Sequence, residues 1–195
     1  MGKIVYLMGK SSTGKDTIYK HLVKNEEIEF HTIVLYTTRP VRAGETEGVE
    51  YFFTDEAGFL KLKEEGKLIE DRAYNTCLGL WRYFTVNDSQ IDLEHKNYVI
   101  IGTLESYNKT KEFFGEAKLV PVMIELDDGV RLQRALDREK LQDAPKYNEM
   151  CRRFLADEED FSEEKIKEAG ICKRFINNDL QQCLEEIMVY LKEQL

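Results

Sequence analysis

The feature that most constrains this chain is a phosphate-binding pattern directly after an apolar run. Residues 4–8 read Ile-Val-Tyr-Leu-Met, and residues 9–17 read Gly-Lys-Ser-Ser-Thr-Gly-Lys-Asp-Thr. The second segment fits the P-loop pattern G-x-x-x-x-G-K-[ST] except at Asp16, which replaces a hydroxyl. Glycines let backbone N–H groups surround phosphate oxygens, the following helix points its positive end at them, and lysine bridges the outer phosphates. The pattern therefore predicts a strand, a phosphate-binding loop and a helix in succession.

Length and composition narrow the class of protein. The chain has 195 residues, 42% of them hydrophobic, and only three prolines, which predicts one compact α/β domain with small insertions. A formal net charge of −9 argues against a general nucleic-acid or anionic-membrane surface, so local arginines must attract anionic substrates. No apolar run approaches the ~20 residues that span a bilayer. The four cysteines form no C-x-x-C pair and no signal region is evident, which predicts a cytoplasmic protein with reduced thiols.

Apolar runs alternate with amphipathic stretches along most of the chain, which predicts a parallel sheet flanked by helices. Strands are expected at residues 4–8, 33–36, 98–101, 119–126 and 174–176. Helices are expected at residues 14–24, 104–114, 129–140, 146–167 and 180–192.

Two stretches interrupt this alternation. Residues 37–87 are rich in charged and aromatic side chains, with short strand-like pieces at 49–53, 68–74 and 81–86, and look like an inserted subdomain. Residues 138–153 are polar, contain Pro145 and are expected to form a mobile lid. The core of the single domain would then consist of residues 1–36, 88–137 and 154–195.

The segments after the P-loop carry a family resemblance. Residues 37–45 read Thr-Thr-Arg-Pro-Val-Arg-Ala-Gly-Glu and residues 48–53 read Gly-Val-Glu-Tyr-Phe-Phe. With the P-loop, they resemble guanylate kinase, and the resemblance continues through Phe59, Gly66, Glu70, the lid and residues 175–179. It implies a P-loop kinase fold with a monophosphate-binding insertion and a lid. The implied activity is transfer of the γ-phosphoryl group of ATP to a nucleoside monophosphate, foremost GMP or dGMP, with Mg²⁺ as cofactor.

The resemblance also implies roles for individual residues. Phosphoryl transfer needs two polyanions held in line while positioned cations neutralise the transferred group. The implied catalytic cations are Lys15, Arg39, Arg138 and Arg153, with Arg152 a near-equal alternative to Arg153. The implied ATP site comprises Gly9, Lys10, Ser11, Ser12, Thr13, Gly14, Lys15, Asp16, Thr17 and Asn177.

The acceptor site has its own implied residues. Arg39 and Arg42 could offer planar forks to the acceptor phosphate, with the Tyr51 hydroxyl adding a neutral donor. Glu70 matches the family's guanine-reading carboxylate, which can accept from both N1–H and the exocyclic amine.

Several positions depart from the family pattern. Leu35 stands where the family has a serine. The segment Leu78-Gly79-Leu80 keeps the family's glycine but lacks its phenol and its hydroxyl. The family's acidic residue is missing from Gly102-Thr103-Leu104, and Glu105 follows one place beyond. Tyr83 or Trp81 could compensate for the lost phenol. A more apolar base pocket leaves open a different nucleotide or another small phosphorylated acceptor.

Asp16 admits two interpretations. Because a strand carboxylate is missing elsewhere, Asp16 could ligate Mg²⁺ in its place, with Thr17 as a possible source of a hydroxyl. The rival interpretation is a degenerate P-loop, and a non-catalytic guanylate-kinase-like binding module is the corresponding alternative function. The acidic stretch 157–160 is expected to be a solvated helix face, and the oligomeric state is not visible in the sequence.

Overall fold

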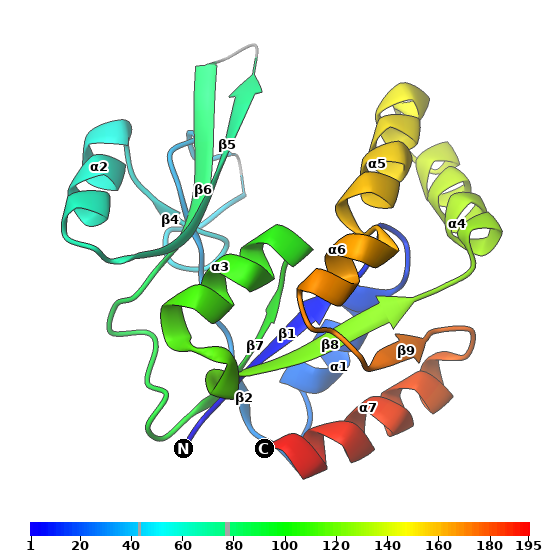
Figure 1. Cartoon of the computed structure of the whole chain (residues 1–195). Helices are drawn as coiled ribbons and strands as arrows, with labels where there is room; N and C mark the ends of the chain where they lie inside the picture. The colour runs from blue at the N-terminus through cyan, green and yellow to red at the C-terminus, as the bar shows by residue number, and fades with distance from the viewer. Residues whose placement is uncertain (43, 77–78) are drawn as a thin grey trace.

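A five-stranded parallel sheet forms the centre of the molecule in a computed structural model that describes residues 1–42, 44–76 and 79–195 (Figure 1). The strand order is β2-β7-β1-β8-β9, and every pairing in it is parallel. The bounds are β1 Ile4–Met8, β2 Phe30–His31, β7 Asn97–Ile101, β8 Leu119–Glu125 and β9 Arg174–Ile176. The sheet confirms the predicted fold class.

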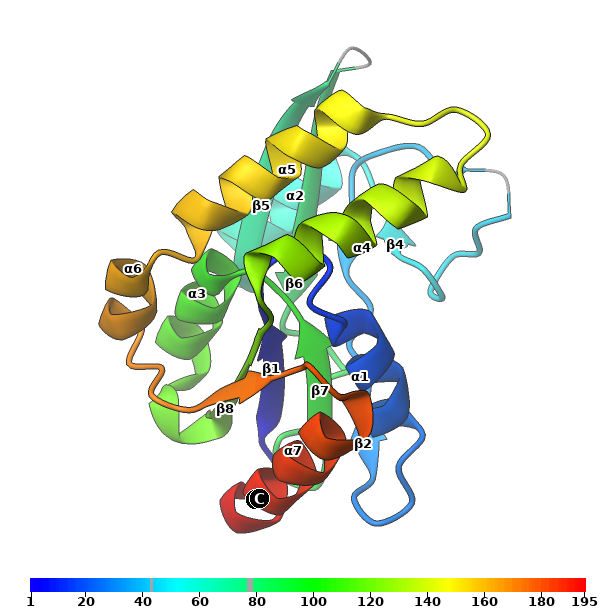
Figure 2. The same ribbon diagram turned by 90° about the vertical axis from the view of Figure 1, so that its right-hand side faces the viewer.

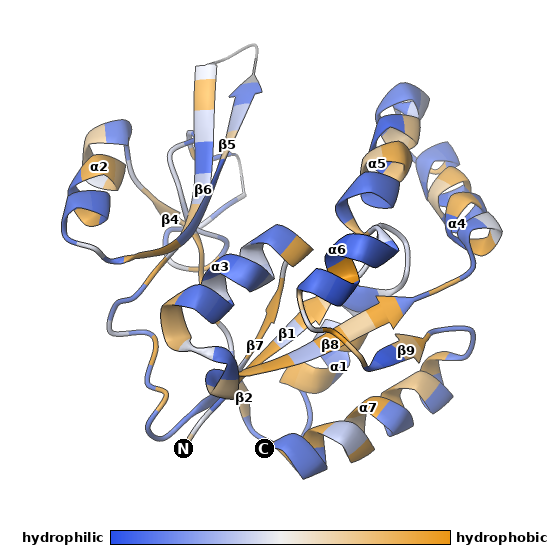
Figure 3. Cartoon of the chain, viewed as in Figure 1, coloured by the Kyte–Doolittle hydropathy of each residue, from blue (hydrophilic) through white to orange (hydrophobic). Residues whose placement is uncertain are grey.

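The core packs on both faces of β1, which explains its uninterrupted apolar sequence. Ile4, Tyr6 and Met8 join one buried cluster with residues of α3 (Leu104–Phe114) and α6 (Glu163–Glu168). Val5 and Leu7 join the opposite cluster with residues of α1 (Lys15–Val23) and α7 (Leu180–Gln194). Figure 3 shows the apolar strands between helices whose outward surfaces are hydrophilic. The short helix η1 spans Glu116–Lys118.

A second, four-stranded sheet lies in the interrupted stretch of the sequence, with strand order β4-β3-β6-β5. Its strands are β3 Tyr36–Thr37, β4 Phe52–Phe53, β5 Leu68–Thr76 and β6 Gly79–Val86. Helix α2 (Glu56–Glu64) covers one face, where Phe59 meets Phe84 edge-on at 5.0 Å between ring centroids. The β5–β6 hairpin rises above α3, between α2 on one side and α5 on the other (Figure 1).

Helices α4 (Asp128–Lys140) and α5 (Tyr147–Asp160) lie side by side and are joined by residues 141–146 (Figure 2). They stand beyond the carboxyl ends of β1 and β8, across from the β5–β6 hairpin (Figure 1). The stretch expected as a lid therefore contains the end of α4, a short loop and the start of α5.

Some expected elements were wrong. The strand expected at residues 33–36 is replaced by the two short strands β2 and β3, and strand 49–53 shortens to β4. The helix expected at 146–167 is broken, because α5 ends at Asp160 and Ser162 precedes the separate helix α6. Helix α2 was not anticipated. Within the described residues, no helix is both long and apolar enough to cross a bilayer.

Candidate active site

The P-loop connects the carboxyl end of β1 to the start of α1. Gly9 and Gly14 have φ angles of 149° and 91°, a region that favours glycine. A Cβ atom would overlap the Ile124 carbonyl in the first case and the Asn177 amide in the second. Asn177 follows β9 and donates from Nδ2 to the Thr13 carbonyl at 2.7 Å. The last strand therefore braces the loop that is expected to hold ATP.

Ser11 is fixed on both sides by helices α4 and α5. Its backbone N–H donates to Asp157 Oδ2 at 2.7 Å, and its carbonyl accepts from Arg131 Nη1 at 3.1 Å. Arg131 is 1% exposed and its Nη2 lies 2.6 Å from Asp128 and 2.7 Å from Glu158. The expectation of a solvated acidic face is therefore wrong for Asp157, which supports the P-loop.

Lys15 is the phosphate-binding cation expected from the sequence, and it begins α1. Within the described part of the chain its ammonium has no ion-pair or hydrogen-bond partner, and burial lowers its pKa. A poorly solvated ammonium without a partner is suited to receive a phosphate oxygen. Lys10, by contrast, is paired with Glu158 at 2.6 Å.

Asp16 and Thr17 are exposed in the first turn of α1. No group of three or more His, Cys, Asp or Glu side chains in the described ranges could hold a metal by itself. Mg²⁺ is usually bound by one or two carboxylates together with substrate phosphates, and Asp16 beside Lys15 fits that kind of ligand set.

A cavity of about 110 Å³ joins the P-loop to the lid helices. Ser11 and Ser12 line it from the loop, and Arg138 and Arg153 line it from α4 and α5. The Ser12 hydroxyl is buried and has no hydrogen-bond partner among the described residues. Arg138 and Arg153 thus share a cavity with the P-loop.

Arg152 differs from Arg153 in its surroundings. Both arginines pair with Glu149, at 2.8 Å and 2.9 Å respectively. Arg152 does not belong to the lining of that cavity. This geometry favours the register that assigns the lid role to Arg153.

Arg39, the first residue of the expected acceptor clamp, is 3% exposed and already paired. Its Nη1 and Nη2 donate to the two carboxylate oxygens of Glu45 at 2.7 Å and 2.6 Å. The paired guanidinium lowers the pKa of Glu45 to about 2, and the same hydrogen bonds raise the pKa of Arg39. Its Nε is buried without a hydrogen-bond partner within the described ranges. A phosphate would have to compete with Glu45 for this guanidinium.

Aromatic rings surround the clamp. The Arg39 guanidinium lies 5.0 Å from the centroid of the Tyr51 ring, which meets Tyr83 edge-on at 5.6 Å. Arg42 is exposed and lies 6.0 Å from the ring of Trp81. Tyr51, Tyr83 and Trp81 therefore all lie near the two arginines.

Glu70, expected to read guanine, is buried under a neighbouring arginine. Its side chain is 2% exposed, whereas that of Arg72 is 20% exposed. Glu70 accepts from Arg72 Nε at 3.1 Å and from the Thr85 hydroxyl at 2.9 Å. The Arg72 guanidinium is therefore more exposed than the Glu70 carboxylate on this part of β5.

The end of β7 shows what replaces the missing acidic residue. Gly102 has no side chain, and a Cβ there would overlap the Tyr6 hydroxyl and ring. The Tyr6 hydroxyl donates to Ser106 Oγ at 2.7 Å, and burial raises the pKa of Tyr6 to about 12. A neutral phenol therefore fills the space next to this position.

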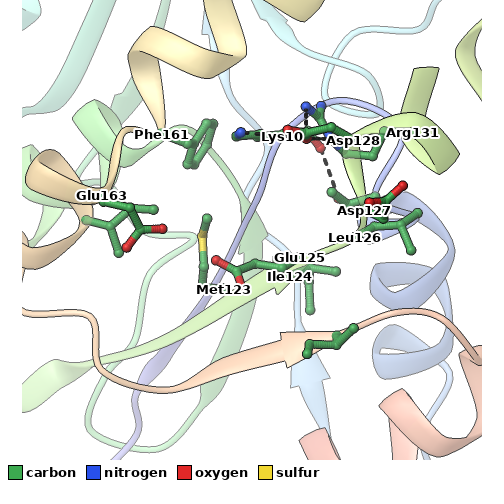
Figure 4. Close-up of a pocket in the computed structure, with 13 residues that line it drawn as sticks. Lys10, Met123, Ile124, Glu125, Leu126, Asp127, Asp128, Arg131, Phe161 and Glu163 are labelled. Carbon is green, nitrogen blue, oxygen red and sulfur yellow. Dashed lines mark hydrogen bonds and ion pairs between the residues drawn. The ribbon is translucent and has the colours of Figure 1, made fainter.

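A larger cavity of about 360 Å³ lies beside the P-loop, above β8 (Figure 4). Lys10 and Arg131 line its P-loop side and both pair with Asp128, while Met123 and Phe161 provide an apolar wall. Glu125 and Glu163 are held by Arg174 at 2.9 Å and 2.7 Å. Its charges are thus largely paired within the protein.

Sequence reasoning missed four residues that shape these sites, namely Arg131, Asp157, Arg72 and Tyr6. Arg131 is one of three arginines in residues 131–138, and the sequence did not distinguish a buried arginine from a surface one. Asp157 was visible only as part of an acidic stretch, because its partner Ser11 lies in the P-loop. Arg72 stands two residues after Glu70 on the same strand, but nothing local indicated that its guanidinium would pair with that carboxylate. Ala43, Cys77 and Leu78 lie outside the described residues, so the segment Leu78-Gly79-Leu80 is described only in part.

Comparisons with known proteins agree on one family. The sequence profile "Guanylate kinase" matches residues 1–82. The guanylate kinase of Caldanaerobacter subterraneus subsp. tengcongensis is 30% identical over 146 residues, which cover 72% of this chain and 68% of that protein. The guanylate kinase of Thermobifida fusca is 44% identical over 68 residues, 35% of this chain and 34% of the relative. This alignment therefore spans about a third of that relative's length.

The structural comparison shows the same fold over a longer range. The crystal structure of guanylate kinase from Anaplasma phagocytophilum matches with a TM-score of 0.61 and 19% identity. The match covers 100% of this chain and 87% of that one. The structural match therefore spans more of the chain than residues 1–82, which the family profile covers.

Proposed function

The chain belongs to the guanylate kinase family, and from this premise we propose that it transfers the γ-phosphoryl group of ATP to a nucleoside monophosphate, with GMP or dGMP as the acceptor. The observation that carries the proposal is the cavity in which Ser11 and Ser12 of the P-loop meet Arg138 and Arg153 of the lid helices. A kinase needs cations around the transferred group, and Arg138 and Arg153 would supply them opposite the P-loop.

Each part of the site then has a task. Lys15 and the P-loop amides hold the outer phosphates of ATP, and Asn177 maintains the loop conformation beside the nucleotide. Arg39, Arg42 and Tyr51 hold the acceptor phosphate, and Glu70 belongs to the part of the site that receives the base. Arg138 and Arg153 neutralise charge on the transferred group and help to exclude water.

Mg²⁺ belongs to the proposal as the cation that accompanies ATP. Asp16 would hold it together with phosphate oxygens, because hard carboxylate oxygens are the ligands that Mg²⁺ prefers. The ion would neutralise the phosphates next to Lys15 and so offset the repulsion between them and Asp16. A cytoplasmic location is also part of the proposal, supported by the scattered cysteines of the sequence.

The test is a coupled assay of ADP release with ATP and Mg²⁺ against GMP, dGMP, AMP, CMP, UMP and dTMP. We expect the highest kcat/KM with GMP or dGMP. The other monophosphates are included because Leu35 and Leu80 replace hydroxyl groups expected near the acceptor, which could change the preferred base. Absence of turnover with every monophosphate, in a sample that binds a protein partner, would support the non-catalytic module instead.

A further inference from the structure

The base-binding part of the acceptor site is set by the pairing of β5 with β6. Glu70 lies opposite Thr85, and Arg72 lies opposite Tyr83. Directly opposed residues share a face of a sheet, as do residues two apart on one strand. Glu70, Arg72, Thr85 and Tyr83 therefore share one face, opposite the face that packs on α2 through Phe84.

This face runs continuously into the phosphate clamp. Tyr83 meets Tyr51 at 5.6 Å, and the Tyr51 ring lies 5.0 Å from the Arg39 guanidinium. Arg72 is therefore linked, through its cross-strand neighbour Tyr83, to the residues expected to hold the acceptor phosphate. A nucleotide whose phosphate binds Arg39 would extend its base along this face.

Arg72, and not Glu70, borders the open space beside this face. A cavity of about 670 Å³ lies between β5 and α3, with α6 on the other side, and Arg72 and Tyr74 line it while Glu70 does not. The Glu70 carboxylate is 2% exposed and is occupied by Arg72 and Thr85. Arg72 Nη1 has no hydrogen-bond partner within the described part of the chain, so its N–H groups are available to a ligand.

A guanidinium and a carboxylate recognise different edges of guanine. A carboxylate accepts from N1–H and the exocyclic amine, whereas an arginine fork donates to O6 and N7, the two adjacent acceptors of the Hoogsteen edge. Adenine carries an amino group in place of O6 and cannot accept there. An arginine fork therefore distinguishes guanine from adenine without any contribution from the 2-amino group.

We propose that Arg72 reads the acceptor's guanine by donating to O6 and N7, and that Glu70 acts as a positioning residue that holds the guanidinium in place. The proposal rests on the proposed function and names how the same site selects its base. It also accounts for the lost hydroxyl at Leu80, because Arg72 supplies a donor to the base from the neighbouring strand.

The test compares equilibrium binding by calorimetry and kcat/KM for GMP, IMP, 7-deaza-GMP and AMP. IMP lacks the 2-amino group but keeps O6 and N7, so it should bind within about threefold of GMP if Arg72 reads the base. The 7-deaza analogue lacks the N7 acceptor and should bind about tenfold more weakly than GMP. AMP should be the poorest of the four.

Variants separate the roles of the two residues. Arg72→Ala should weaken GMP and IMP alike, by about 10- to 100-fold, and abolish the difference between GMP and 7-deaza-GMP. Glu70→Gln should also weaken both equally, leaving the GMP-to-IMP ratio unchanged. Arg82→Ala is the matched control, because Arg82 lies on the α2 face of the same hairpin and pairs with Glu56 at 2.9 Å. It should bind GMP within twofold of the unmodified protein.

The outcomes distinguish this proposal from the proposed function. IMP binding more than tenfold weaker than GMP, with 7-deaza-GMP equal to GMP, would overturn the role of Arg72 even in an active kinase. Equal binding of GMP by Arg72→Ala would do the same. Binding that follows the expected pattern without ADP formation would support the role of Arg72 and overturn the kinase activity. Absence of binding by any monophosphate would overturn both.

Discussion

The two proposed phosphate sites of this molecule hold their cations in opposite ways. Lys15, at the end of the parallel sheet, has no ion-pair partner within the described residues and a pKa lowered by burial. Arg39, just after strand β3 of the four-stranded sheet, donates to both oxygens of Glu45 and lies near the Tyr51 ring. The P-loop is therefore ready for phosphate, whereas the acceptor clamp must exchange an internal carboxylate for its ligand.

This difference follows from the architecture around each site. Lys15 begins a helix that is anchored in the core through Ile18 and Leu22, so its position does not depend on a partner charge. Arg39 follows the two-residue strand β3 and depends on side-chain interactions for its position. A cation in a rigid element can stay unpaired, while a cation in a short, irregular segment is fixed by a carboxylate. The following predictions test this contrast, from the largest expected effect to the smallest.

Replacement of Lys15 should have the largest effect. Lys15→Met removes the cation that contacts the outer phosphates, and turnover should fall by about 10³-fold without loss of folding. The measurement is steady-state ADP formation, with circular dichroism as a check on the fold. Lys20→Met, an exposed lysine on the same helix, is the matched control and should retain full activity. Retention of a tenth of the activity by Lys15→Met would contradict the proposed role of the P-loop.

Replacement of Arg39 should have the next largest effect. Arg39→Ala removes a fork from the acceptor phosphate and should lower kcat/KM for the monophosphate by about 10²-fold. The KM for ATP should change little, because Lys15 and the P-loop are separate from this residue. Arg82→Ala again serves as the matched arginine control in the same sheet. A rise in the KM for ATP equal to that for the monophosphate would break the distinction between the two sites.

Asp16 should contribute a smaller, metal-dependent effect. Asp16→Ser removes the carboxylate proposed to hold Mg²⁺, and the Mg²⁺ concentration for half-maximal turnover should rise about tenfold. Binding of Mn²⁺ in the presence of ADP, followed by electron paramagnetic resonance, should weaken in parallel. If Asp16→Ser binds Mn²⁺ and turns over substrate as the unmodified protein does, Asp16 is not a metal ligand.

The pairing of Glu45 with Arg39 should appear in the pH dependence of stability. The folded-state pKa of Glu45 is about 2, below the value of about 4.3 expected in the unfolded chain, so its contribution is complete above that value. The contribution is lost as the pH falls from about 4.3 towards 2. Urea unfolding from pH 6 to pH 2 should therefore show a gap between the unmodified protein and Glu45→Gln that narrows in acid. A gap that does not change with pH would show that the carboxylate is not selectively stabilised by folding.

The sequence predicted the parallel core well because its strands are continuous apolar runs. Ile4–Met8 and Arg174–Ile176 match the observed strands residue for residue, and the P-loop marked the junction between β1 and α1. The break between α5 and α6 was missed although Ser162, followed by Glu163 and Glu164, is typical of a helix start. The same holds for α2, where Asp55 accepts from the Gly58 N–H as an N-cap.

The chemistry of the sites was harder to predict than their location. Arginine at position 39 was visible as a phosphate ligand, but its pairing with Glu45 depends on how the chain folds between them. Glu70 was visible as a carboxylate, but its burial depends on Arg72 and on Thr85, which lies 15 residues away on the partner strand. Local patterns indicate which charges are present, whereas the folded chain decides how each charge is paired and buried.

The contact between Tyr6 and Gly102 restricts the order in which substitutions at these two positions could occur. An aspartate introduced at position 102 would collide with the Tyr6 ring, and its charge would be forced against a buried phenol. A smaller residue at position 6 would first have to open the space, at the cost of a cavity in the core. The residues at positions 6 and 102 therefore constrain each other. Introducing an acidic residue at position 102 would require an intermediate protein of lower stability.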